Sequence, residues 1–201
     1  VLIKLAFGYG AHAETLLALR MLMALPLFWT IYWWESRRKP MIPLTWPDRL
    51  KLFFLGFLGY FLSSYLDFLG LQYISVGLER IVLYLTPTIV LVISYCVLHK
   101  PITRLQWYSL IIGYLGVFIV FIQDASSTGI SAWLGMVLVF ASACSYATYM
   151  IGSGEMVQRI GSVRLVVYAS TASAILSLIQ SSLYNPSAIF EQIQVIYWLS
   201  L

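Results

Sequence analysis

The chain has 201 residues, of which 61% are hydrophobic and 10% are charged. An average soluble domain has about 25% charged residues, so this composition excludes an ordinary soluble domain. The net charge of +4 comes from basic loops between apolar segments, and it does not indicate a nucleic-acid-binding surface.

Six apolar segments follow one another along the chain, each about twenty residues long, which is the length that a helix needs to cross a bilayer core. They lie at 15–34, 51–71, 76–98, 105–123, 132–151 and 163–183. The segments are continuously apolar, whereas the strands of a membrane barrel alternate between apolar and polar residues. We therefore predict an all-α, polytopic helical membrane protein that lies in the lipid bilayer.

Apolar residues also occupy both ends of the chain. Residues 1–8 are typical of the end of an earlier helix, and residues 195–201 of the start of a further one. We therefore expect the chain to be a fragment that lacks sequence at both ends.

Basic residues are concentrated in alternate loops. Three loops, at 35–51, 99–104 and 152–164, contain nine of the twelve Lys and Arg residues, and the intervening turns contain none. Because cytoplasmic loops are enriched in Lys and Arg, this pattern predicts that the three basic loops are cytoplasmic. We expect a multi-pass protein of the cell membrane, with the bacterial cytoplasmic membrane as its location.

Small residues recur on one face of two of the predicted helices. They are Gly56, Gly59, Ser63 and Gly70 on the helix at 51–71, and Gly113 and Gly116 on the helix at 105–123. Small side chains let membrane helices approach closely. We predict that both faces pack against neighbouring helices.

Five ionisable residues remain inside or at the edge of the apolar segments: Lys4, Arg20, Asp67, Glu79 and Arg80. When residues are counted inward from the predicted outer turns at 1.5 Å per residue, all five lie roughly 5–8 Å below the outer boundary. Charged groups within a membrane are costly, and they indicate a function by default.

Two interpretations of this charged layer stay open. In the first, Lys4 and Arg20 extend to the interface while Asp67 and Arg80 form an ion pair that pins a helical hairpin. In the second, the layer is an outer gate or the end of a substrate cavity, and Glu79 exchanges a proton and pairs with Lys4 or Arg20. The summed charge of the five groups, +1, would favour a carboxylate or a phosphate as ligand.

A proline interrupts the segment at 76–98. Pro87 removes one backbone hydrogen bond and frees the carbonyl group of Leu83. Discontinuous helices near the middle of the membrane are typical of transporter binding sites. We expect the following residues on the adjoining helix faces to line a cavity: Tyr60, Ser64, Tyr84, Pro87, Tyr146 and Tyr149.

Catalytic and metal-binding motifs are absent from the sequence. It has no HExxH, no GxSxG, no phosphate-binding glycine loop and no Cys/His cluster. His12 and His99 lie at opposite predicted membrane faces, so they cannot act together. We expect neither an enzyme nor a bound metal or cofactor.

Several stretches together carry a family resemblance. They are Lys4-Leu-Ala-Phe with Arg20 in the next helix, Leu71-Gln-Tyr-Ile-Ser-Val-Gly-Leu-Glu-Arg80, Leu85-Thr-Pro87-Thr, and Gly113-Tyr-Leu-Gly-Val-Phe. In order, spacing and topology the chain resembles EamA-type members of the drug/metabolite transporter superfamily. The likeness covers essentially the whole chain and is strongest from about residue 55 to 122.

The resemblance implies a ten-helix transporter made of two inverted five-helix repeats. Residues 1–123 would then be the first repeat, with its first helix truncated, and 124–201 the start of the second. The chain would contain the end of helix 1, helices 2–7 and the start of helix 8.

The function that the resemblance implies is secondary transport, with export of small metabolites or amphipathic compounds by alternating access. We expect Asp67, Glu79 and Arg80 to form a gate or a coupling cluster, with Lys4 and Arg20 balancing their charge. A small-molecule substrate is the expected partner, and protons and a second copy of the chain are further candidates. The alternative is a membrane scaffold or assembly subunit that transports nothing.

Overall fold

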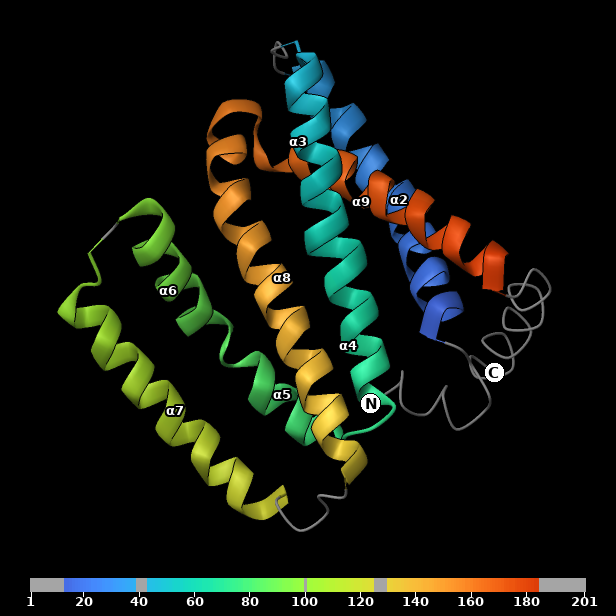
Figure 1. Ribbon diagram of the computed structural model, residues 1–201. Helices are drawn as coiled ribbons and strands as arrows, with labels where there is room; N and C mark the ends of the chain where they lie inside the picture. The colour runs from blue at the N-terminus through green and yellow to red at the C-terminus, as the bar shows by residue number, and fades with distance from the viewer. Residues whose placement is uncertain (1–12, 39–42, 100, 125–129, 185–201) are drawn as a thin grey trace. The chain divides into compact units, whose positions relative to one another are not determined.

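The computed structural model describes residues 13–38, 43–99, 101–124 and 130–184 (Figure 1). All regular elements in these ranges are helical, which confirms the predicted all-α fold. They are α2 (Ala13–Arg38), α3 (Trp46–Gly56), the π-helical η1 (Phe57–Leu62), α4 (Ser63–Leu71), α5 (Val76–Leu83), α6 (Thr86–Leu98), α7 (Arg104–Asp124), α8 (Ile130–Ile160) and α9 (Ser162–Tyr184).

Five helical stretches within the described residues are long and apolar enough to cross a membrane. They are Thr15–Arg38, Trp46–Leu71, Val76–Leu98, Ala132–Ile160 and Ser162–Leu183. Each contains one of the predicted spans, and α7, of 21 residues, contains the predicted span at 105–123. The prediction of a polytopic helical membrane protein is therefore confirmed.

Several helices extend beyond the predicted spans. The predicted loop at 152–164 is helical apart from Gly161, and helix also covers both ends of the predicted loop at 35–51. The apolar pattern marks only the part of a helix that lies in lipid. Glu155, Met156, Gln158 and Arg159 are all good helix formers, so α8 continues past its apolar part.

The connection between α8 and α9 is very short because one glycine makes it. Gly161 has a φ of +86°, a left-handed conformation that only glycine adopts without strain. The chain therefore reverses between two long helices without a loop.

The chain divides into two compact units. Among the described residues, the first unit contains those up to Phe61 and those from Gly152 onward, and the second contains residues 62–151. Each unit has its own internal packing.

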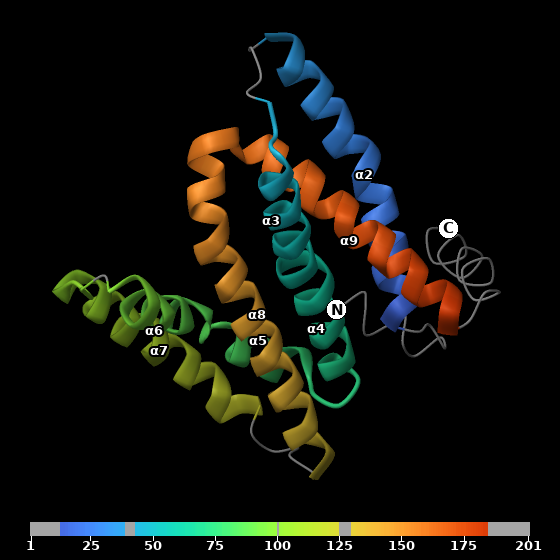
Figure 2. The same ribbon diagram turned by 45° about the horizontal axis from the view of Figure 1, so that its top comes forward.

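In the first unit, α2 and α3 pack against α9, and Figures 1 and 2 both show α2 alongside α9. A Cβ atom added at Gly56 would lie 2.5 Å from the backbone oxygen of Ala169. The buried residues of α9 include two alanines, Ala169 and Ala174, and four serines, Ser170, Ser173, Ser177 and Ser181. Small residues on both helices allow this close approach, as predicted for Gly56.

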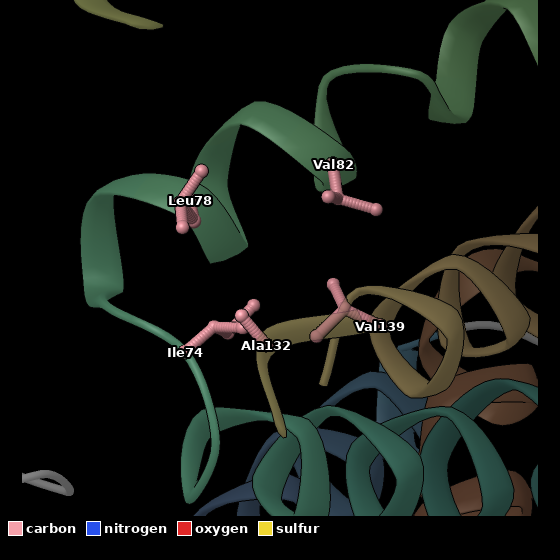
Figure 3. Packing of buried hydrophobic residues seen from close by; sticks show 5 residues of the cluster. All are labelled: Ile74, Leu78, Val82, Ala132 and Val139. Atoms are coloured by element: carbon pink, nitrogen blue, oxygen red, sulfur yellow. The ribbon is translucent and has the colours of Figure 1, made fainter. Parts of the chain in front are cut away.

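The second unit has an apolar core between α5 and the first half of α8. Figure 3 shows its five buried residues: Ile74, Leu78, Val82, Ala132 and Val139. A Cβ atom at Gly70 would lie 2.5 Å from a methyl group of Val139, so the packing prediction also holds for Gly70.

Gly113 differs from the packing prediction. A Cβ atom added there would meet no atom within 4 Å, so the prediction of close helix packing at Gly113 is wrong. Gly116 lies outside the residues whose surroundings the structure describes. The open space beside Gly113 belongs to a cavity, because α4, α6, α7 and α8 leave a volume between them that their side chains do not fill.

Candidate functional site

The site begins at a break between α5 and α6. Helix α5 ends at Leu83 and α6 begins at Thr86, so the segment at 76–98 is discontinuous, as Pro87 predicts. The side-chain hydroxyl of Thr86 donates a hydrogen bond of 2.6 Å to the carbonyl oxygen of Leu83. The carbonyl group that the proline leaves without its helical partner is thus satisfied by the residue just before the proline.

A cavity of about 930 Å³ adjoins this break, and all the residues that line it belong to the second unit. Its walls come from α4, α6, α7 and α8, with further residues from the break itself. The polar lining residues are Ser63, Ser64, Asp67, Tyr84, Thr86, Gln106, Ser109, Tyr114, Ser142 and Tyr146. The main apolar ones are Leu83, Pro87, Val90, Leu91, Leu105, Leu110 and Met150.

Hydrogen bonds between helices fix the walls of this cavity. Ser142 Oγ on α8 donates a hydrogen bond of 2.7 Å to the backbone oxygen of Ser63 on α4. The hydroxyl groups of Thr88 on α6 and Tyr114 on α7 are also hydrogen-bonded to each other. The cavity is therefore held by hydrogen bonds from side chains that lie on or beside its lining.

One acidic residue lies in the described wall of the cavity. Asp67, on α4, is the one charged residue among the described residues that line it. The other polar groups are hydroxyls and one amide, and the remaining wall is apolar. An apolar cavity with a few converging polar groups is the usual form of a small-molecule binding site.

Most of the predicted cavity residues lie around this volume. Ser64, Tyr84, Pro87 and Tyr146 all line it. Tyr149 does not line it; it is buried, and its ring centroid lies 5.7 Å from that of Tyr146. Tyr60 is part of η1 and belongs to the first unit.

The structure describes four of the five residues of the predicted charged layer. Asp67, Glu79 and Arg80 belong to the second unit, Arg20 belongs to the first, and Lys4 lies outside the described residues. Of these, only Asp67 lines the cavity.

Glu79 lies beside Arg80 on α5. Its side chain is 4% exposed, and its Oε2 atom lies 3.7 Å from Nε of Arg80, whose side chain is 66% exposed. These two successive side chains meet because the long Arg80 side chain can bend back toward its neighbour. The pairing of Glu79 with Lys4 or Arg20, and that of Asp67 with Arg80 in the other interpretation, stay predictions from the sequence.

Three polar cavity residues on α7 are absent from the sequence predictions: Gln106, Ser109 and Tyr114. A signal for them exists in the spacing of Gln106, Ser109 and Gly113. These positions lie on one face of a helix and carry polar or small residues between apolar ones.

The described residues contain no group of three or more His, Cys, Asp and Glu residues that could hold a metal ion. The chemistry that the cavity offers is therefore that of one carboxylate, several hydroxyls and aromatic rings. This arrangement can bind and orient a small molecule.

Comparison with known proteins agrees with a binding and transport role. Residues 1–122 match the EamA-like transporter family. The chain is also 32% identical over 177 residues to a Bacillus subtilis (strain 168) protein described as "Uncharacterized transporter YcbK". The aligned region is 85% of this chain and 54% of that protein.

The chain thus spans about half the length of this curated relative. No solved structure matches the chain. The family match covers more than half of the residues, and the chain belongs to the EamA-like transporter family.

Proposed function

We propose that the protein is a secondary transporter whose substrate occupies the cavity of the second unit. The observation that carries the proposal is the cavity of about 930 Å³ beside the break between α5 and α6. Discontinuous helices that border a cavity are a recurring feature of transporter binding sites. Membership of a transporter family supports the same assignment.

The lining favours small amphipathic molecules that carry a positive charge. Asp67 supplies a carboxylate that would attract an amine or another cation. Tyr84 and Tyr146 supply aromatic rings, whose faces also attract cations. This choice replaces the preference for anions drawn from the charged layer, because neither Arg20 nor Arg80 lines the cavity.

Asp67 also offers a route to proton coupling. If its carboxyl group accepts either a proton or the positive group of the substrate, then the release of one accompanies the binding of the other. A proton gradient directed into the cell would then drive export by alternating access. We assign this role to Asp67 rather than to Glu79, because Glu79 does not line the cavity.

The proposal includes the orientation of the chain in the membrane. The three basic loops lie on the cytoplasmic side, and the intervening turns lie on the opposite side. Two inverted repeats, at 1–123 and 124–201, and a homodimer stay predictions from the resemblance. A scaffold that transports nothing would need no cavity with polar groups in its wall, so the cavity supports transport over that alternative.

Flux measurements in proteoliposomes test the proposal. Vesicles with an acidic interior are given ethidium, an amphipathic cation, or carboxyfluorescein, an organic anion. We expect ethidium to accumulate faster than in protein-free vesicles, and carboxyfluorescein to behave alike in both. Equal ethidium uptake with and without protein, or uptake of carboxyfluorescein alone, would count against the proposed substrate class.

A further inference from the structure

A second cavity lies within the first unit, between α3 and α9, and the transport proposal makes no use of it. It has a volume of about 440 Å³. The described residues that line it are Leu44, Arg49, Leu52, Phe53, Arg164, Tyr168, Thr171, Ala172 and Ile175. All of them belong to the first unit.

The charge of this cavity is positive. Arg49 and Arg164 both line it, and none of the described residues in its lining is acidic. Asp48 precedes Arg49 in the chain, but its oxygens accept hydrogen bonds from Thr45 and from Arg159 Nη1. The two arginines therefore place two positive charges at one cavity, whereas the neighbouring carboxylate is engaged elsewhere.

Arg164 is also buried, with only 8% of its surface exposed. A buried cation is costly unless anionic or polar groups compensate it. Tyr168, which also lines the cavity, is hydrogen-bonded to Arg164, and an anion bound there would add a charged partner to this polar one.

The cavity changes from polar to apolar along its helices. Arg49 and Arg164 lie in the first turns of α3 and α9, where the helix dipoles add positive potential. Phe53 lies one turn further along α3, and Ile175 lies 11 residues beyond Arg164 on α9, which is roughly 16 Å deeper at 1.5 Å per residue. A ligand that fills this cavity has a negative group at one end and an apolar body at the other.

We propose that this cavity binds the phosphate group of an anionic ligand, with the arginines as its ligands. Arginine matches phosphate through two parallel hydrogen bonds. Basic pockets between membrane helices on the cytoplasmic side bind anionic lipid head groups. Both arginines come from loops that the sequence predicts to be cytoplasmic. The apolar end at Phe53 and Ile175 favours a phospholipid over free phosphate, because free phosphate has no apolar part that could contact these side chains.

Native mass spectrometry of the purified protein tests this proposal by titration with single lipids. Phosphatidylglycerol is compared with phosphatidylcholine of the same acyl chains, and a separate arm adds inorganic phosphate alone. Arg49→Gln and Arg164→Gln each remove one proposed ligand. Arg104→Gln is the matched control, because it removes one positive charge from another predicted cytoplasmic loop and Arg104 does not line the cavity.

We expect phosphatidylglycerol to bind more tightly than phosphatidylcholine to the parent protein and to Arg104→Gln. Each of the other two substitutions should weaken phosphatidylglycerol binding roughly tenfold or more, as the loss of a charge-assisted hydrogen bond does. Arg49 is exposed, so Arg49→Gln keeps the test decisive even if Arg164→Gln fails to fold.

The arms distinguish the two sources of phosphate. Saturable binding of inorganic phosphate that Arg49→Gln weakens would support an anion site for free phosphate. Equal binding of both lipids with no binding of phosphate, or unchanged binding in Arg49→Gln, would overturn the proposal. The outcome is independent of ethidium flux, because the two cavities share no residue.

Discussion

The hydroxyl group of Thr86 donates a hydrogen bond to the carbonyl oxygen of Leu83 across 2.6 Å, at the break between α5 and α6. Pro87 has no N–H group to offer that carbonyl. In a membrane an unsatisfied backbone group costs several kcal/mol. Thr86 therefore makes a permanent break possible beside the cavity.

Replacing Thr86 tests this account of the break. Thr86→Val keeps the shape of the side chain and removes the hydroxyl, so the Leu83 carbonyl loses its partner. We expect the apparent free energy of unfolding in detergent to fall by about 1–3 kcal/mol. Thr86→Ser keeps the hydroxyl and should stay close to the parent protein. A valine variant as stable as the serine variant would contradict the role given to Thr86.

Two glycine substitutions compare a tightly packed position, Gly56, with Gly113, which has open space beside it. A Cβ atom at Gly56 would lie 2.5 Å from backbone oxygen of Ala169, which cannot move aside. Gly56→Ala should therefore lower the free energy of unfolding by about 1–3 kcal/mol. Gly113→Ala meets no atom within 4 Å, and it should be neutral or stabilise by up to about 1 kcal/mol, since alanine favours helix. Thermal unfolding of both variants in the same detergent checks that Gly56→Ala is the less stable of the two. A lower stability of Gly113→Ala would contradict the prediction.

Much of this fold could be predicted because apolar length alone determines which segments cross the membrane. The break near Pro87 could also be predicted, because proline cannot donate the helical hydrogen bond. Its compensation by Thr86 could not, since a threonine hydroxyl can bond to its own helix or to a neighbouring one, and the sequence does not say which.

The charged groups show the limit of counting along helices. Counting gives the depth of a residue but not the neighbour that its side chain meets. Asp67 and Glu79 lie at similar predicted depths, yet Asp67 lines the cavity and Glu79 is buried beside Arg80. Similarly, Arg49 and Arg164 resemble ordinary loop charges in the sequence. Arg49 lines a cavity because α3 begins at Trp46, five residues before its apolar segment, and Arg164 does so from the first turn of α9.

The ion pair of Asp48 and Arg159 in the first unit gives another prediction. Asp48 is buried and accepts hydrogen bonds from Thr45 and from Arg159, at 2.8 Å for the latter, whereas the Arg159 side chain is 51% exposed. Asp48→Asn should lower the melting temperature more than Arg159→Gln, because an exposed partner is screened by solvent. The double variant should be less damaged than the sum of the two, since they share one interaction. A larger decrease in melting temperature for Arg159→Gln than for Asp48→Asn would contradict this prediction.

Asp67→Asn tests the charge of the transport cavity. The substitution keeps the size of the side chain and removes its negative charge, so the attraction for a cation is lost. We expect ethidium flux in proteoliposomes to fall at least tenfold, with folding retained. Glu155→Gln, which also removes one carboxylate but does not line the cavity, should transport as the parent protein does. Full ethidium flux in Asp67→Asn would exclude Asp67 as the cation-binding group.

The central claim is that the substrate binds in the cavity of the second unit. The most direct test of this claim places a large side chain in that cavity. Ser109 lines it, whereas Ile112 on the same helix does not line it and is 70% exposed. Equilibrium binding of radiolabelled tetraphenylphosphonium, an amphipathic cation, is measured for Ser109→Trp and Ile112→Trp in the purified protein. The account predicts that Ser109→Trp abolishes binding and that Ile112→Trp binds as the parent protein does. Unchanged binding by a folded Ser109→Trp variant would show that the substrate binds elsewhere.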